Sequence, residues 1–170
     1  MREFDHSLAI GAPASRILDA FFNHDDLAAW WHVTRSLCHP RVLGSYAIEW
    51  ATTEAIDDVL GRLGGTFHGT VMDFRPGREF FVAEAYWLPP DGEPIGPMAL
   101  AVSCTDLGGR VVLRVRQSGG ESSRRWSRYY ELLGARMTSA LDELKAHVEA
   151  ATAAPDAASG SSRDPERDGA

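Results

Sequence analysis

The stretch APASRILDAFFNHDDLAAWW, residues 12–31, predicts two short helices in succession. Pro13 suits the first turn of a helix, because its fixed φ is helical and its missing N–H needs no partner there. Apolar residues then recur at helical spacing, at Ala14, Ile17, Leu18 and Phe21. Asn23 interrupts this pattern, and Asp25 and Asp26 favour the N-terminus of a second helix, which ends in two tryptophans.

Trp30 and Trp31 cannot both lie on one apolar stripe, because consecutive side chains point about 100° apart around a helix. We expect one ring to pack beneath the short helix and the other to turn toward the open end of the fold. The alternative is that both rings serve only as core and rim packing, which is the common role of tryptophan in folded proteins.

Strand-forming segments lie on both sides of this stretch. Residues 4–10 alternate in the period-2 pattern of a strand. Beyond Pro40, similar segments are separated by turn sequences, at residues 44–53, 66–74, 80–87, 99–107 and 110–117. The last two segments predict a hairpin that pairs Leu100, Val102 and Cys104 with Val111, Leu113 and Val115. Residues 53–65 fit no pattern and form either a mobile loop or a strand bent by glycines.

The longest regular element comes last. Apolar residues recur every three or four positions from Ser123 to Ala150, which predicts a single helix. At a rise of 1.5 Å per residue this helix is about 40 Å long, whereas an eight-residue strand covers about 27 Å. The helix must therefore lie across the sheet. Residues 151–170 lack periodicity, so we expect a disordered tail after one domain of residues 1–150.

The composition is that of a globular protein, with 44% hydrophobic and 24% charged residues in a chain of 170. A net charge of −7 argues against nucleic-acid and membrane partners, since both need a concentrated basic face. No apolar run approaches the roughly 18 residues of a membrane span, and residues 1–10 do not resemble a secretory signal. We therefore expect a cytoplasmic protein in which Cys38 and Cys104 are reduced thiols.

The predicted elements follow an α+β plan with the helices on one face of an antiparallel sheet. A sheet of this many strands coils, so a straight helix laid across it lies closer to the sheet at its ends than at its middle. We therefore expect a cavity between the curved sheet and the last helix.

This order of elements resembles the SRPBCC or START-like superfamily, and within it the branch named for the activator of heat-shock protein 90 ATPase, the AHSA-type branch. The matching stretches are residues 12–31, GTVMDFRPG at 69–77, FFVAEAYW at 80–87 and ALDELKAHVEA at 140–150. The most specific parts are the paired tryptophans and the step at Gly69, Val71 and Pro76. The resemblance covers about residues 3 to 150 and implies a helix-grip fold, also called START/Bet v-like, in which a curved antiparallel sheet wraps around a long C-terminal helix.

The resemblance also carries expectations about function. Members of the superfamily hold apolar small molecules, and some catalyse cyclisation or hydrolysis or protect against a toxic compound. The eukaryotic chaperone activators carry a further domain before this one, so we expect a bacterial-type single domain without chaperone stimulation. The AHSA-type branch often has Gly-Trp midway along the last helix, where this chain has Gly134-Ala135, and we expect a wider pocket there.

Candidate ligand-binding residues lie on the faces that we expect to point inward. Most of them should belong to the core, and those at mid-sheet or on the last helix should line the cavity. The candidates are Trp30, Trp31, Tyr46, Trp50, Phe81, Trp87, Leu100, Val102, Leu113, Tyr130, Leu133 and Met137.

His68 and Glu84 are the weak catalytic candidates, because their strands are expected to be adjacent. If both faced inward, the pair could act as acid and base or bind a polar ligand group. Alternation with Phe81 and Trp87 inside places Glu84 toward solvent instead. We therefore expect no catalytic residue.

Three arginines begin the last helix, at Arg124, Arg125 and Arg128, where the helix macrodipole disfavours cations. A contact from Arg128 to Glu131 would offset part of this cost. The alternative is a basic rim that attracts an acidic ligand to the cavity.

We expect no metal and no cofactor, because the sequence lacks H-E-x-x-H, G-x-S-x-G and G-x-G-x-x-G patterns. The favoured function is a binding protein for an apolar or aromatic small molecule. One alternative is a cyclase- or hydrolase-type enzyme that uses His68, Glu84 or a tyrosine. The other is a co-chaperone-like interaction module that docks through the outer sheet face, with the cavity collapsed. Both a monomer and a homodimer fit the sequence.

Overall fold

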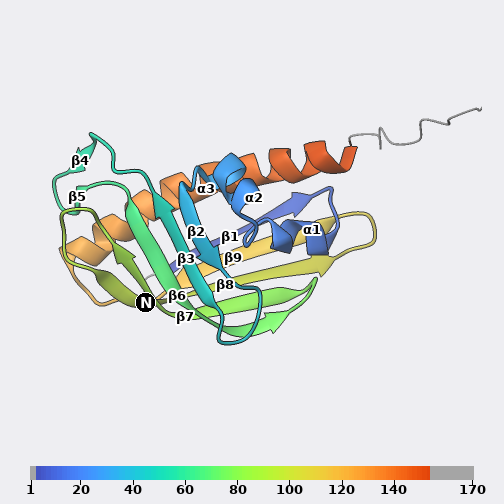
Figure 1. The fold of residues 1–170 in the computed structure, drawn as a ribbon, viewed down its shortest axis with the longest axis horizontal. Coiled ribbons are helices and arrows are strands. Elements are labelled where there is room, and N and C mark those ends of the chain that lie inside the picture. The colour runs from blue at the N-terminus through green and yellow to red at the C-terminus, as the bar shows by residue number, and fades with distance from the viewer. Residues whose placement is uncertain (1–2, 154–170) are drawn as a thin grey trace, which may run out of the picture.

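A curved antiparallel sheet and a long helix laid across it form the two layers of the protein (Figure 1). The computed structural model describes residues 3–153. The sheet has the order β1-β9-β8-β7-β6-β3-β2. Its strands are β1 (Glu3–Ile10), β2 (Arg35–Cys38), β3 (Ser45–Trp50), β6 (Gly65–Arg75), β7 (Glu79–Leu88), β8 (Ile95–Asp106) and β9 (Val111–Ser118). The helices are α1 (Ala14–Asp19), α2 (His24–Trp31) and α3 (Arg124–Ala153), and β4 (Ile56–Asp57) and β5 (Gly61–Arg62) form a separate hairpin.

This architecture is the predicted α+β helix-grip fold. The predicted hairpin is confirmed, with Val102 opposite Val115 and Cys104 opposite Leu113, whereas Leu100 lies opposite Gln117 and Val111 lies opposite Asp106. The edge strand β2 and the β4–β5 hairpin are additions that the sequence pattern did not predict. The last helix continues past Ala150 to Ala153, and the remainder of the predicted tail, residues 154–170, lies outside the described residues.

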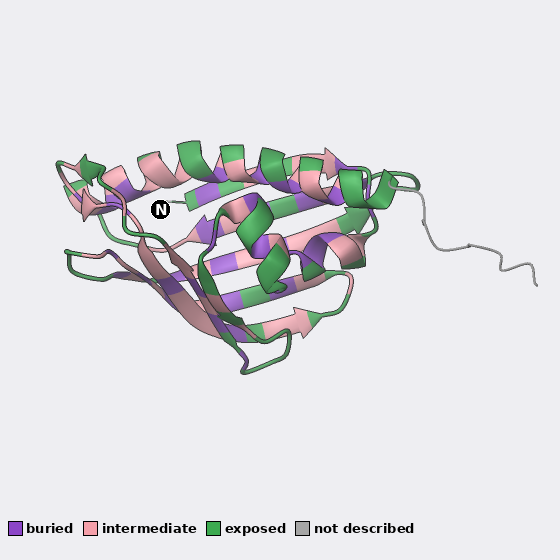
Figure 2. Ribbon diagram, turned by 45° about the horizontal axis from the view of Figure 1, so that its top comes forward, coloured by how far each residue is buried: buried purple, intermediate pink, exposed green. Residues whose placement is uncertain are grey.

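The C-terminal half of α3 is fixed to β1 and to the turn that follows it. Lys145 Nζ donates a hydrogen bond to the carbonyl of Ala9 at 2.9 Å, and Gly11 N donates to Glu149 Oε1 at 2.9 Å. On the sheet-facing side of the helix, Leu141, Leu144 and Val148 are fully buried. Figure 2 shows this division along α3, with buried residues toward the sheet and exposed residues on the outer side.

Asp26 joins the three helices. Arg16 of α1 donates two hydrogen bonds to the Asp26 carboxylate, both at 2.7 Å, and His147 of α3 contacts the same carboxylate at 2.7 Å. The Asn23 side chain caps α2 by accepting from the N–H of Asp26 at 3.1 Å. The Arg16 bonds, helped by His147, outweigh partial burial and lower the pKa of Asp26 below its ordinary value.

The junction between α1 and α2 is held by buried aromatic side chains. Trp30 Nε1 donates to the carbonyl of Ala20 at 2.8 Å, and Tyr46 Oη donates to the carbonyl of Phe21 at 2.9 Å. Carbonyls at the end of a helix have no intrahelical partner, so these two bonds satisfy groups that would otherwise be buried without one. The expectation that one of the paired tryptophans packs beneath the short helix is confirmed for Trp30, which is fully buried.

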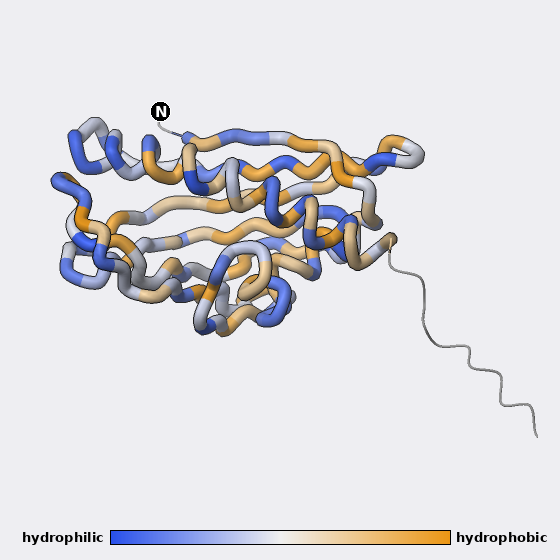
Figure 3. The backbone as a smooth tube through the Cα atoms, turned by 90° about the horizontal axis from the view of Figure 1, so that it is seen from above, coloured by the Kyte–Doolittle hydropathy of each residue, from blue (hydrophilic) through white to orange (hydrophobic). Residues whose placement is uncertain are grey.

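The prediction that Phe81 points inward is wrong, because 37% of this residue is exposed. Hydrophobic residues occur along the strands of the sheet (Figure 3), and a bulge interrupts the alternation of buried and more exposed residues in β7. Phe80 and Val82 are buried before the bulge and Trp87 is buried after it, while Glu84 has a φ of 50°. The bulge changes which residues face the core, so counting back in steps of two from Trp87 selects the wrong phenylalanine.

Gly69 on β6 lies opposite this bulge. A Cβ atom at Gly69 would come within 2.6 Å of Val82 Cγ1 and 2.9 Å of the Ala83 carbonyl oxygen. Such contacts are well inside van der Waals distance, so any larger residue would push the two strands apart. The glycine of the G-x-V step therefore has a structural role: it permits the close approach of the bulged strand.

Replacing Asp26 by Asn should lower the free energy of unfolding at pH 7 by about 2 kcal/mol, because Arg16 and His147 lose a charged acceptor. Folding lowers the pKa of Asp26, so its stabilisation is present above the ordinary value of 3.8 and is lost as the pH falls through the lower folded pKa. The stability difference between wild type and variant should therefore narrow at pH 3. Urea titrations at both pH values measure it, with exposed Asp25→Asn as the control. Equal losses in the two variants would contradict this role of Asp26.

Candidate functional site: a cavity beneath the long helix

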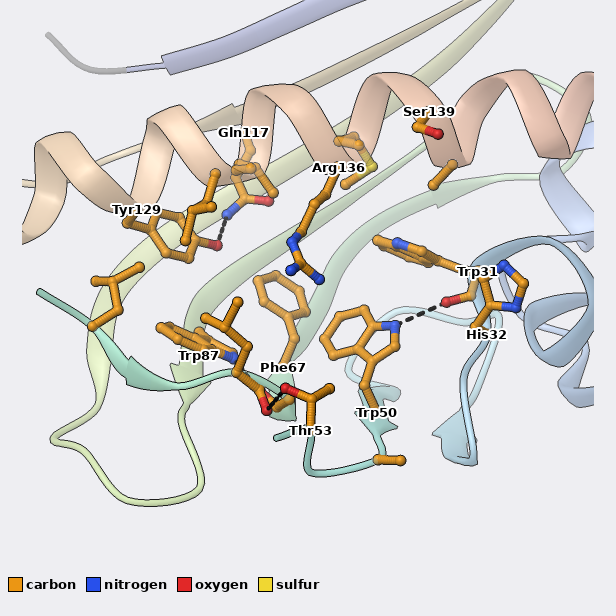
Figure 4. A pocket seen from close by; sticks show the side chains of 18 of the residues that line it. Trp31, His32, Trp50, Thr53, Phe67, Trp87, Gln117, Tyr129, Arg136 and Ser139 are labelled. Atoms are coloured by element: carbon orange, nitrogen blue, oxygen red, sulfur yellow. Dashed lines mark hydrogen bonds between the residues drawn. The ribbon is translucent and has the colours of Figure 1, made fainter. Parts of the chain in front are cut away.

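A cavity of about 490 Å³ lies between the sheet and the middle of α3 (Figure 4). Apolar side chains form most of its wall. The roof is a face of α3 that includes Leu132, Leu133 and Met137, and the floor includes Phe67 and Leu100 of the sheet. The cavity occurs where α3 crosses the curved sheet, between the anchored C-terminal half of the helix and its N-terminal turns.

Three tryptophans line the cavity, and the indole N–H groups of two of them are bonded to backbone carbonyls. Trp50 Nε1 donates to the carbonyl of Trp31 at 2.9 Å, and Trp87 Nε1 donates to the carbonyl of Gly64 at 2.9 Å. The ring of Trp31 stacks on that of buried Trp30, with a centroid separation of 4.7 Å and an interplanar angle of 14°. With the N–H groups of Trp50 and Trp87 bonded to backbone, both rings are held in place beside the cavity.

Residues 51–64, which we call the strap, close one side of the cavity with Leu60 and Leu63. The strap carries the β4–β5 hairpin and is fixed to α3 by Asp57, which accepts a hydrogen bond from Arg128 Nε at 2.7 Å. Asp57 also accepts from the N–H groups of Val59 and Leu60. Although burial raises the pKa of Asp57, these backbone donors and Arg128 lower it below its ordinary value.

A neutral polar pair lies inside the cavity. Gln117 is 2% exposed, and its Nε2 donates to Tyr129 Oη at 2.6 Å. It is the one buried polar or charged residue among those that the structure describes. Burial raises the pKa of Tyr129, so this hydroxyl stays protonated at neutral pH.

Charged groups lie closer to solvent, at the α2 side of the cavity. His32, at the C-terminal end of α2, contacts Glu143 of α3 through its Nε2 at 2.8 Å from Glu143 Oε2. Arg136 also belongs to the cavity wall and extends from α3 toward the floor, where Trp50 and Phe67 lie (Figure 4).

Half of the predicted ligand-binding residues border the cavity, namely Trp31, Trp50, Trp87, Leu100, Leu133 and Met137. Four others are buried in the surrounding core, namely Trp30, Tyr46, Val102 and Leu113. Tyr130 is half-buried outside the cavity, where its hydroxyl donates to the Gly119 carbonyl at 2.9 Å. Phe81 is on the opposite, exposed side of the sheet. Strand alternation identifies which residues face the helix layer. It does not identify the part of each strand where the sheet lies far enough from α3 to leave a cavity.

The wider pocket expected at Gly134-Ala135 does not occur, because Ala135 is exposed and does not border the cavity. The cavity residues that the sequence analysis missed come mainly from the strap and from the polar side chains Gln117, Arg136, His32 and Glu143. A usable signal was present for Arg136, since Leu132, Leu133 and Ala140 lie three or four positions from it and share its face of the helix.

His68 and Glu84 do not border the cavity. His68 follows buried Phe67 on β6, so it faces the other side of the sheet, where its ring stacks on Tyr86 at 6.0 Å. Glu84 is exposed at the bulge. The thiols are also unsuited to nucleophilic chemistry, because burial raises the pKa of Cys38 to about 11 and that of Cys104 to about 12.

At the start of α3, the predicted contact between Arg128 and Glu131 is confirmed at 3.1 Å. Arg128 is thus bonded to acids on both its own helix and the strap.

Among residues 3–153, no helix is both long enough and apolar enough to cross a membrane.

Comparisons with known proteins identify the fold. No protein-family model matches the chain, and neither does any curated protein. Among solved structures, a protein from Rhodobacter sphaeroides superimposes with a TM-score of 0.68 at 14% identity, over 87% of this chain and 93% of that one. CV1439 from Chromobacterium violaceum gives 0.62 at 21% identity, over 88% and 99%. The Aha1 dimer from Colwellia psychrerythraea gives 0.58 at 17% identity, over 88% and 97%. These likenesses agree with an AHSA- or SRPBCC-like fold.

Replacing Asp57 by Ala should loosen the strap, because the carboxylate holds both the turn at residues 57–60 and the contact to Arg128. We expect amide hydrogen exchange within residues 51–64 to become at least about tenfold faster, which corresponds to about 1.4 kcal/mol of local stability. Exchange in β8 and β9 should be unaffected. Asp58→Ala, at the exposed adjacent position, is the matched control. Unchanged exchange of the strap in Asp57→Ala would show that the carboxylate does not fix it.

Proposed function

We propose that this chain is a cytoplasmic, single-domain member of the SRPBCC superfamily, of the AHSA-type branch, and that it binds an apolar or aromatic small molecule beneath α3. The observation that carries the proposal is the cavity itself. Its volume of about 490 Å³ falls within the range of roughly 300–1,000 Å³ that is usual for small-molecule sites. Its wall combines tryptophan rings with aliphatic side chains, and such surfaces bind apolar molecules by removing them from water.

The arrangement of polar groups favours binding over catalysis. The pair that the sequence offered as acid and base, His68 and Glu84, is absent from the cavity wall. Within the wall, His32 and Glu143 contact each other, and Gln117 and Tyr129 form a neutral hydrogen-bonded pair. Such groups can orient a ligand by hydrogen bonding, and they are less suited to transferring a proton to or from it.

The structural neighbours support the family assignment in the proposal at the level of the fold, and the net charge of −7 supports a ligand other than nucleic acid. The anchored helix and the strap enclose the cavity together with the sheet. A module that works only through its outer sheet face would have no need of this volume.

A pair of phenylalanine substitutions on α3 tests the proposal. Ala140 borders the cavity and Ala135 is exposed on the same helix, so Ala140→Phe should fill the site and Ala135→Phe should not. We expect isothermal titration calorimetry with 2-naphthol to show binding to the wild type and to Ala135→Phe. The affinity of Ala140→Phe should be at least about tenfold lower, a loss of about 1.4 kcal/mol.

Circular dichroism and thermal unfolding should show that both variants are folded. Equal affinity in Ala140→Phe and Ala135→Phe would place the binding site elsewhere. Native mass spectrometry of the protein purified from its own cells would then identify the molecule that occupies the site.

A further inference from the structure

Arg136 is the cation of the cavity wall that has no acidic partner. It lies midway along α3, and its side chain extends from the helix over the aromatic floor (Figure 4). Within residues 3–153, no carboxylate forms an ion pair with it. An arginine in this position presents a planar set of donors to whatever occupies the cavity.

The sequence of α3 explains why Arg136 is unpaired. On a helix, a side chain meets those three and four positions away. Arg128 has Glu131 at such a position and Lys145 has Glu149, and both pairs form ion pairs. The corresponding neighbours of Arg136 all border the cavity and none is acidic; they are Leu132, Leu133, Ser139 and Ala140.

The other ionisable groups of the wall leave Arg136 uncompensated. Glu143 contributes a carboxylate, but it contacts His32 at 2.8 Å and lies two helical turns from Arg136, about 10 Å along the helix axis. The pair formed by Gln117 and Tyr129 is neutral. Among residues 3–153, no carboxylate forms an ion pair with Arg136, whereas the Glu143 carboxylate is already bonded to His32.

A neutral apolar ligand would bind at a cost in this cavity, because it would displace water from the guanidinium without replacing its hydrogen bonds. A ligand with an anionic group on its apolar body would replace that water with a charge-assisted, bidentate contact. The same apolar wall that binds the body would lower the local dielectric and strengthen the contact.

From this arrangement we infer that the ligand of the cavity is an apolar or aromatic carboxylate, whose body lies between the sheet and α3 and whose anionic group binds Arg136. The inference rests on the proposed function and specifies the ligand class of the same site. It also sets the orientation of the ligand: the charged end lies at Arg136, and any neutral polar substituent lies at Gln117 and Tyr129.

Two pairs of probes that differ in charge but little in shape test the inference: 2-naphthoate with 2-naphthamide, and decanoate with decanamide. Calorimetry at pH 7.5 and low salt should show that the wild type binds each carboxylate at least about tenfold more tightly than its amide, because hydrogen bonds to charged groups are the stronger ones. The preference should diminish in 0.5 M NaCl, since salt screens an exposed charge.

Arg136→Gln should remove the preference by weakening carboxylate binding about tenfold or more, while amide binding stays within about twofold. Retained amide binding also shows that the variant is folded. Arg136→Lys should keep part of the preference, because it retains the charge but loses the forked geometry. Arg124→Gln is the matched control, since Arg124 is an exposed cation of the same helix outside the cavity wall.

The outcomes separate the two proposals. Equal binding of carboxylates and amides by the wild type, or an undiminished preference in Arg136→Gln, would overturn the inference and leave the proposed function standing. A preference that depends on Arg124 and not on Arg136 would assign the attraction to the basic start of the helix and would also overturn it. If none of the four probes bound, both the inference and the proposed function would fail.

Discussion

The anchoring of α3 at both ends is the constraint on which the rest of the structure depends. Lys145 and Glu149 fix its C-terminal half to backbone groups at the end of β1, and His147 fixes it to the α2 carboxylate of Asp26. At the other end, Tyr130 bonds to the carbonyl of Gly119, just after β9. A helix of 30 residues held in this way stays straight where it crosses the coiled sheet. Because the sheet curves away from the helix between the anchored ends, a cavity remains between them.

The α1–α2 stretch determines where that volume ends. Trp30 and Trp31 stack on each other, but only Trp30 is fully buried, with its N–H bonded to the end of α1. The ring of Trp31 lies one layer further out and borders the cavity, and its carbonyl accepts the Trp50 N–H. Two adjacent tryptophans therefore have different positions: Trp30 belongs to the core and Trp31 borders the cavity.

The polar groups of the cavity are distributed unevenly, and this distribution gives the site a direction. The Gln117–Tyr129 pair is neutral, while Arg136 carries a charge that its own helix does not balance. Protein interiors tolerate charges only when they are paired or hydrated, so an arginine that faces an apolar space is costly to dehydrate without an anion. Leu60 and Leu63 of the strap close one side of the cavity. The strap is held to α3 by its Asp57 carboxylate, which accepts a hydrogen bond from Arg128.

The sequence by itself determined the two short helices, the longer strands and the long last helix, because these follow from local periodicity. It also required the paired tryptophans to point in different directions, because neighbouring side chains lie about 100° apart around a helix. It could not give the facing of Phe81, since the bulge at Glu84 changes which residues of β7 face the core and depends on the packing of β7 against its neighbouring strands. Nor could it separate the core residues Tyr46 and Leu113 from the wall residues Trp50 and Leu100. Alternation along a strand shows which side chains face inward. The distance between the sheet and α3 at each point along a strand depends on the curvature of the whole sheet. Only the tertiary structure decided that distance, and with it which inward residues border the cavity.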